Sequence, residues 1–105
     1  MTTELSTERD VATKPADEID TDRLCVAARS VLDRMSDLVA EGLTDAGVER
    51  VTRHARVLAD LHALQTLSVG ALREHALTVR DALTPLGGER ALTFAVWIDD
   101  GLGAA

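Results

Sequence analysis

The sequence has few of the residues from which most active sites are built. Cys25 is its only cysteine, so one chain forms no internal disulfide and no zinc or iron–sulfur site based on cysteines. The only aromatic residues are Phe94 and Trp97. No apolar run approaches the roughly 18 residues that span a bilayer, and no charged-then-apolar leader opens the sequence. A reducing, cytoplasmic location without a transmembrane segment is therefore expected.

Positively charged residues are also fewer than negatively charged ones. The net charge is −7 over 105 residues, and the only lysine is Lys14. Acidic residues are concentrated in the first 23 positions. An acidic total argues against sequence-independent binding to nucleic-acid phosphates or to anionic membranes.

Leucine and alanine dominate the hydrophobic residues, which make up 46% of the chain. Such a core with almost no aromatic residues is typical of packed helices. The length suits one modest domain and is too short for two separate cores. The predicted class is all-α, with three to four helices forming a helical hairpin or small bundle that is completed by oligomerisation or a partner.

The first 16 residues differ in composition from the rest. They are rich in threonine and charge, and their only sizeable apolar residues are Leu5 and Val11. Burial of so little apolar surface does not offset the entropy lost on ordering, which predicts a disordered acidic tail. The alternative is a docking arm that orders on a partner. Residues 17–105 are predicted to form the helical domain.

A first helix is predicted over 18–41, with Asp20 or Thr21 as its cap and Gly42 at its end. Its apolar residues have 4-3-4-3 spacing, which gives one stripe along the helix. The stripe residues are Leu24, Ala28, Val31, Met35 and Leu38.

A second helix is predicted over 44–66, begun by Thr44 or Asp45. Its apolar residues recur mostly every third position, so the stripe winds around the helix. Either this helix contacts two partners, or the chain breaks near Thr66, Ser68 and Gly70. The stripe residues are Val48, Val51, Ala55, Leu58, Leu61, Leu64 and Leu67.

Two further helices are predicted, over 69–84 up to Pro85 and over 89–100. The last is apolar nearly all round, and a small domain has little interior to surround it. At least one of its faces, including Trp97, is expected to contact another chain. The competing interpretation is that this helix folds back and fills the core of a monomer.

No catalytic, cofactor-binding or metal-binding motif is present. His54, His62 and His75 have no HExxH-type spacing and do not converge on one metal by sequence alone. They are interpreted as surface or boundary residues. Cys25 adjoins the first stripe, which favours a small core hydrophobe over a nucleophile.

Arg50, Arg53 and Arg56, with His54, form the one local basic cluster. The simpler interpretation is a solvated helix face paired with Glu49 and Asp60. The functional one is a surface for nucleic acid or an acidic partner, although no aromatic residue is interleaved for base stacking.

Two stretches resemble a known family. LTDAGVERVTRHARVLADL at 43–61 is similar to its "LTD, then VERL, then a Leu-rich helix" pattern, and 81–103 looks like its closing segment. The family comprises small helical proteins of unassigned function, often encoded beside formate dehydrogenases and nickel–iron hydrogenases. The resemblance covers about 40 residues of helix-forming types and departs at residues 84–88. It implies an accessory subunit of a redox complex, without catalytic residues.

Two classes of function follow. The first is a non-catalytic helical interaction or scaffold subunit that binds a protein partner or oligomerises. The second is a small regulator, such as a nucleic-acid-binding or antitoxin-like module that uses the arginine cluster. The residues predicted to form the interface of the first class are Leu58, Leu61, Leu64, Phe94, Trp97 and Ile98.

Overall fold

The computed structural model describes residues 19–103, and the predicted tail at 1–16 lies outside them. The described chain is all-helical, which confirms the predicted class. It contains six α-helices and one 3₁₀ turn rather than three to four helices. These are α2 (Thr21–Asp33), α3 (Met35–Ala40), α4 (Asp45–Leu58), α5 (Leu61–Thr66), α6 (Val69–Leu83), η1 (Thr84–Leu86) and α7 (Glu89–Gly101).

The extra helices come from two breaks that were not predicted. The predicted helix 18–41 is interrupted at Arg34, where the backbone N–H still donates to the carbonyls of Ser30 (3.0 Å) and Val31 (3.3 Å). Neither glycine nor proline marks this position. The predicted helix 44–66 is interrupted at Ala59 and Asp60, whose carboxylate caps α5 by accepting from two backbone N–H groups.

Helix ends elsewhere follow their local sequence. The side chains of Asp20 and Thr44 cap α2 and α4, and Ser68 caps α6, so the break predicted near Ser68 is present. Gly42 has φ +116°, a conformation that side chains other than glycine's rarely adopt. It allows the Leu43 N–H to donate to the Leu38 carbonyl (3.0 Å), which satisfies the end of α3.

The start of α7 is capped by a residue from a distant helix end. Gly88 at the cap position has no side chain, and Glu41 after α3 supplies the missing acceptor. Its two carboxylate oxygens accept from the backbone N–H groups of Arg90 and Ala91, at 2.9 Å each. A negative charge at a helix N-terminus also opposes the helix dipole favourably. This contact joins two parts of the chain that are almost 50 residues apart.

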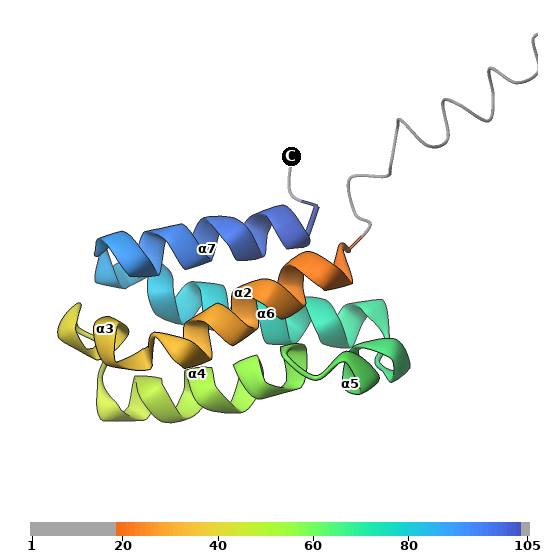
Figure 1. Ribbon diagram of the computed structural model, residues 1–105, viewed down its shortest axis with the longest axis horizontal. Coiled ribbons are helices and arrows are strands. Elements are labelled where there is room, and N and C mark those ends of the chain that lie inside the picture. The colour runs from red at the N-terminus through yellow and green to blue at the C-terminus, as the bar shows by residue number, and fades with distance from the viewer. Residues whose placement is uncertain (1–18, 104–105) are drawn as a thin grey trace, which may run out of the picture.

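The four long helices form an antiparallel bundle (Figure 1). Each contacts two others: α2 packs against α4 and α7, and α6 packs against the same two helices from the opposite side. The winding stripe of α4 is therefore covered by both α2 and α6. Both alternatives for this stripe hold, because α4 has two partners and the chain breaks at Ser68, before α6.

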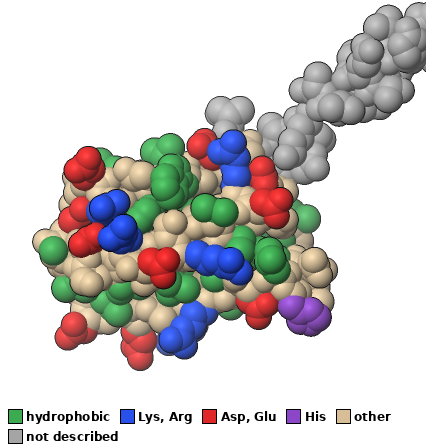
Figure 2. All heavy atoms as spheres, in the orientation of Figure 1, with side chains coloured by type: hydrophobic (Ala, Val, Ile, Leu, Met, Phe, Trp, Pro, Cys, Tyr) green, Lys and Arg blue, Asp and Glu red, His purple; other side chains and the backbone are tan. Residues whose placement is uncertain are grey.

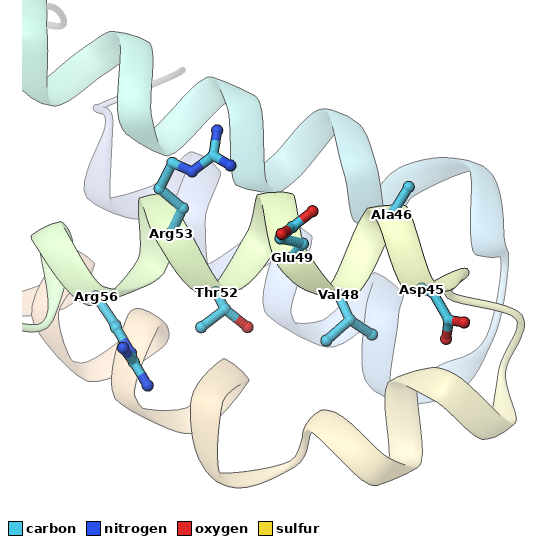
Figure 3. Close-up of a pocket in the computed structure, with 7 residues that line it drawn as sticks. All are labelled: Asp45, Ala46, Val48, Glu49, Thr52, Arg53 and Arg56. Atoms are coloured by element: carbon cyan, nitrogen blue, oxygen red, sulfur yellow. The ribbon is translucent and has the colours of Figure 1, made fainter.

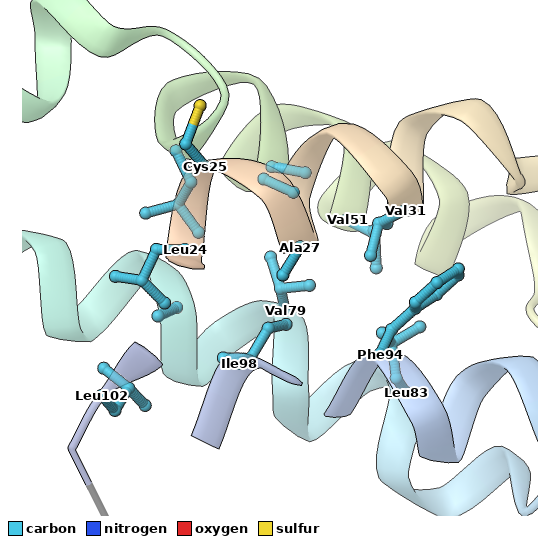
Figure 4. Packing of buried hydrophobic residues seen from close by; sticks show 14 of the residues in the cluster. Leu24, Cys25, Ala27, Val31, Val51, Val79, Leu83, Phe94, Ile98 and Leu102 are labelled. Carbon is cyan, nitrogen blue, oxygen red and sulfur yellow. The ribbon is translucent and has the colours of Figure 1, made fainter. Parts of the chain in front are cut away.

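The core is closed by residues of a single chain (Figure 4). Within the described residues no polar or charged residue is buried. Aliphatic side chains and one phenylalanine fill the space between the helices, as the composition predicted. The largest fully buried side chains are Leu24, Val31, Leu38, Val51, Leu58, Val79, Leu83 and Ile98. Among residues 19–103, none of the helices combines the length and the hydropathy of a membrane span.

Candidate interaction surface

The α2/α7 face carries the largest of the exposed apolar side chains, that of Trp97. Trp97 on α7 is 41% exposed, and its ring lies 5.6 Å from that of buried Phe94, measured between centroids. Val26 on α2 is 59% exposed and lines the same hollow as Trp97. An indole fixed on one side by a core phenylalanine and open to solvent on the other is well placed for contact with another molecule.

Trp97 stands between two hollows that run along the junction of α2 and α7. The first hollow is lined by Asp20, Asp22, Arg23, Val26 and Trp97. The second is lined by Ser30, Asp33, Arg34, Arg90, Phe94 and Trp97. Figure 2 shows hydrophobic side chains between arginine and acidic side chains on this face. We call this surface, made of the residues of the two hollows, the Trp97 face.

Some charges of the Trp97 face are paired and others are not. Arg23 contacts Asp20 (3.5 Å) and Asp100 (3.8 Å), and Arg90 contacts Asp37 (3.4 Å). These pairs are solvent-exposed and contribute little stability. Within residues 19–103, Asp22 and Arg34 form no ion pair. Both are exposed, so they are free to contact a second molecule.

The structure separates the six residues predicted to form an interface. Two of them, Leu61 on α5 and Trp97, are exposed, by 48% and 41%. The other four are covered by the chain's own helices, because α4, α5 and α7 turn these positions toward the bundle interior. The four buried residues are Leu58, Leu64, Phe94 and Ile98. Helix α7 thus packs into the bundle through its inner face, and its outer face remains exposed to solvent.

The basic cluster lies on the outer surface of α4. Arg53 and Arg56 line a shallow hollow with Glu49, and their side chains point away from each other (Figure 3). Arg50 lines a neighbouring hollow near Leu86. None of the three arginines forms an ion pair with another described residue, so the expected pairing with Glu49 and Asp60 is not observed. They present exposed positive charge on an otherwise acidic chain.

Two of the three histidines meet, although the sequence spacing gave no sign of it. The Nδ1 atoms of His54 on α4 and His75 on α6 lie 2.9 Å apart, and the ring centroids are 5.1 Å apart. Partial burial is the largest cause of a lowered pKa for His54, followed by the charges of His75, Arg53 and Arg50. Glu74 acts in the opposite direction. Knowledge that α4 and α6 are antiparallel neighbours is needed to find this pair.

The third histidine and the cysteine lie outside this pair. His62 is exposed on α5, away from the pair. Cys25 is buried and its thiol contacts the Ala59 carbonyl at 3.6 Å, which agrees with a small core residue. In the described part of the chain, no group of three or more His, Cys, Asp or Glu residues is arranged to hold a metal ion.

Comparison with protein-family models, with curated proteins and with solved structures finds no match to this chain in any of the three. Function is therefore inferred from the chain's own residues.

Proposed function

We propose that this chain is a non-catalytic helical interaction subunit that binds a protein chain through the Trp97 face. The observation that carries the proposal is the exposure of Trp97, the only tryptophan, beside Val26, which is also exposed. Large aromatic side chains at the centre of a polar rim commonly anchor protein interfaces. The charged residues around Trp97 provide such a rim.

The test is the size of the native assembly. In cells that express the full chain, Trp97→Ala is expected to release this chain from its larger species, because truncation of an anchor costs about 2 kcal/mol or more. Gel filtration with mass detection measures the change. Val69→Ala is the matched control, since Val69 is an exposed apolar residue on α6 that lines neither hollow of the Trp97 face. An assembly that survives Trp97→Ala unchanged would contradict the proposal.

The finer proposal is that the assembly to which this chain belongs is a redox complex of the formate dehydrogenase or nickel–iron hydrogenase type. It rests only on the resemblance of 43–61 and 81–103 described above. Its test is mass spectrometry of the proteins that co-purify with the wild-type chain and are lost from Trp97→Ala. A co-purifying set without such an enzyme would remove this part of the proposal and leave the interaction role intact.

A second candidate is a regulator that binds a polyanion through Arg50, Arg53 and Arg56. The observation in its favour is that the three exposed arginines have no ion-pair partner in residues 19–103. Salt-dependent binding to duplex DNA, followed by fluorescence anisotropy, tests it. The candidate requires binding that weakens steeply with salt and is lost when all three arginines become alanine. The net charge of −7 opposes it, so the interaction subunit remains the favoured function.

A further inference from the structure

Trp97 lies opposite the middle of α2. At one end of the α2/α7 pair, the Asp20 N–H donates to the Gly101 carbonyl at 2.7 Å. At the other end, Arg90 reaches Asp37. Along the axis of α2, Asp22 and Arg34 are about 18 Å apart, because an α-helix rises about 1.5 Å per residue. Because Trp97 lines the hollows at both ends, it stands between these two unpaired charges.

The two ends of the Trp97 face differ in charge. The first end gathers Asp20, Asp22 and Asp100 around a single guanidinium, that of Arg23. The second end carries two guanidinium groups, with carboxylates in equal number. There Arg90 is engaged by Asp37, whereas Arg34 forms no ion pair among the described residues. The first end therefore has an excess of negative charge. The charges of the second end balance, and both Arg34 and Asp33 lie outside the ion pairs that the described residues form there, so the Arg34 guanidinium is available to an acidic group of another chain.

Two copies of such a face have complementary charges when one copy is rotated by half a turn relative to the other. A two-fold axis near Trp97 exchanges the ends, so the Asp22 end of each copy meets the Arg34 end of the other. Every favourable contact then occurs twice. The axis also brings the two indoles together over Val26, which removes both exposed apolar residues of the hollow from water.

From this arrangement we infer that the partner on the Trp97 face is a second copy of this chain, in a two-fold homodimer. The inference rests on the proposed function, of which it names the partner. Asp22 and Arg34 specify the antiparallel orientation, because a parallel arrangement places like charges opposite each other. Trp97 and Val26 provide the apolar centre.

Sedimentation equilibrium of the purified full chain over micromolar to millimolar concentrations tests the dimer. Asp22→Arg and Arg34→Asp are each expected to weaken dimerisation about tenfold or more, because each change creates two like-charge contacts. The double variant restores opposite charges and is expected to return to within about threefold of wild type. Trp97→Ala is expected to give a monomer.

Two reversals on α4 are the matched controls. Asp45→Arg changes another exposed acid in a first helical turn, and Arg56→Asp changes another exposed arginine without an ion pair. Both lie away from the Trp97 face and are expected to dimerise as wild type does. Thermal melting by circular dichroism confirms that each variant is folded. A wild-type monomer at every concentration, or a double variant no tighter than the single ones, would overturn the homodimer.

Failure of the dimer and failure of the proposed function give different results. If the purified chain is a monomer but Trp97→Ala still releases a different protein from the native assembly, the face binds that protein and only the homodimer is wrong. If Trp97→Ala leaves the native assembly unchanged, the face is not the binding surface, and both proposals are wrong.

Discussion

The imidazole rings of His54 and His75 share one short contact, 2.9 Å between their Nδ1 atoms, across the boundary between α4 and α6. Only one of the two atoms can carry a proton in this contact, because two N–H groups facing each other repel. Arg50 and Arg53 add positive charge nearby, and only Glu74 on α6 opposes them. The folded chain therefore favours a neutral His54.

This pair predicts a pH dependence of stability with a definite sign. The pKa of His54 is lowered from 6.5 in the folded chain, so the unfolded chain binds the proton first as the pH falls. Stability is expected to be unaffected by His54 above about pH 6.5 and to decrease as the pH falls below that value. The midpoint of urea unfolding, measured from about pH 7 to about pH 5, checks this.

His54→Gln is expected to lose less stability than wild type over the same pH range, since it removes the titrating group. His62→Gln is the matched control, because His62 is exposed on α5 and lies outside the pair. It should keep the wild-type pH dependence. Identical curves for all three proteins would show that the pair does not influence folding.

Two leucines of the same sequence stripe should respond differently to truncation. Leu58 is fully buried at the end of α4, whereas Leu61 is 48% exposed at the start of α5. Leu58→Ala is expected to cost about 2–5 kcal/mol of unfolding free energy, from lost transfer energy and a residual cavity. Leu61→Ala is expected to cost about 0.5 kcal/mol or less. Urea unfolding measures both, and equal losses would contradict the break at Asp60.

The close approach of Glu41 to Gly88 predicts that the effect of Gly88→Ala on stability depends on whether Glu41 is present. A Cβ on Gly88 would overlap the Glu41 side chain, so Gly88→Ala should disturb the α7 cap and cost about 1–2 kcal/mol. In a Glu41→Ala background the overlap is gone. The Gly88 backbone, at φ −82°, suits alanine, and the same change should then be neutral or stabilising.

A double-mutant cycle from thermal or urea unfolding gives the coupling between the two positions. Destabilisation of equal size in both backgrounds would mean that the loop before α7, and not Glu41, limits the size of residue 88.

Local signals predicted much of the fold. The caps at Asp20 and Thr44, the end at Gly42 and the stop before Pro85 follow from side-chain hydrogen bonding and allowed backbone angles, which act over a few residues. The leucine and alanine content gave the all-α class. The break at Asp60 also had a local signal, because aspartate is a strong N-cap, but the continuous apolar stripe obscured it.

The remaining features depend on contacts between distant segments. The break at Arg34 occurs without a glycine or proline, and the Glu41 cap on α7 and the His54–His75 pair require the bundle to be assembled. The same is true of the predicted interface: burial of Phe94 and exposure of Trp97 distinguish two neighbouring aromatic residues that share one apolar run. Periodicity identifies apolar positions but not which of them the chain itself covers.

The hydrogen bond from Asp20 to Gly101 places the two ends of the described fold side by side, as Figure 1 also shows. A short glycine–serine linker could therefore join residue 103 to residue 19 without crossing the bundle, and new ends could be opened between Leu67 and Ser68, in the short connection between α5 and α6. Such a circular permutant would keep the packing of the four long helices and would have its ends at the α5/α6 connection, which lines neither hollow of the Trp97 face. Fusion partners or fluorescent labels could then be attached without obstructing that face.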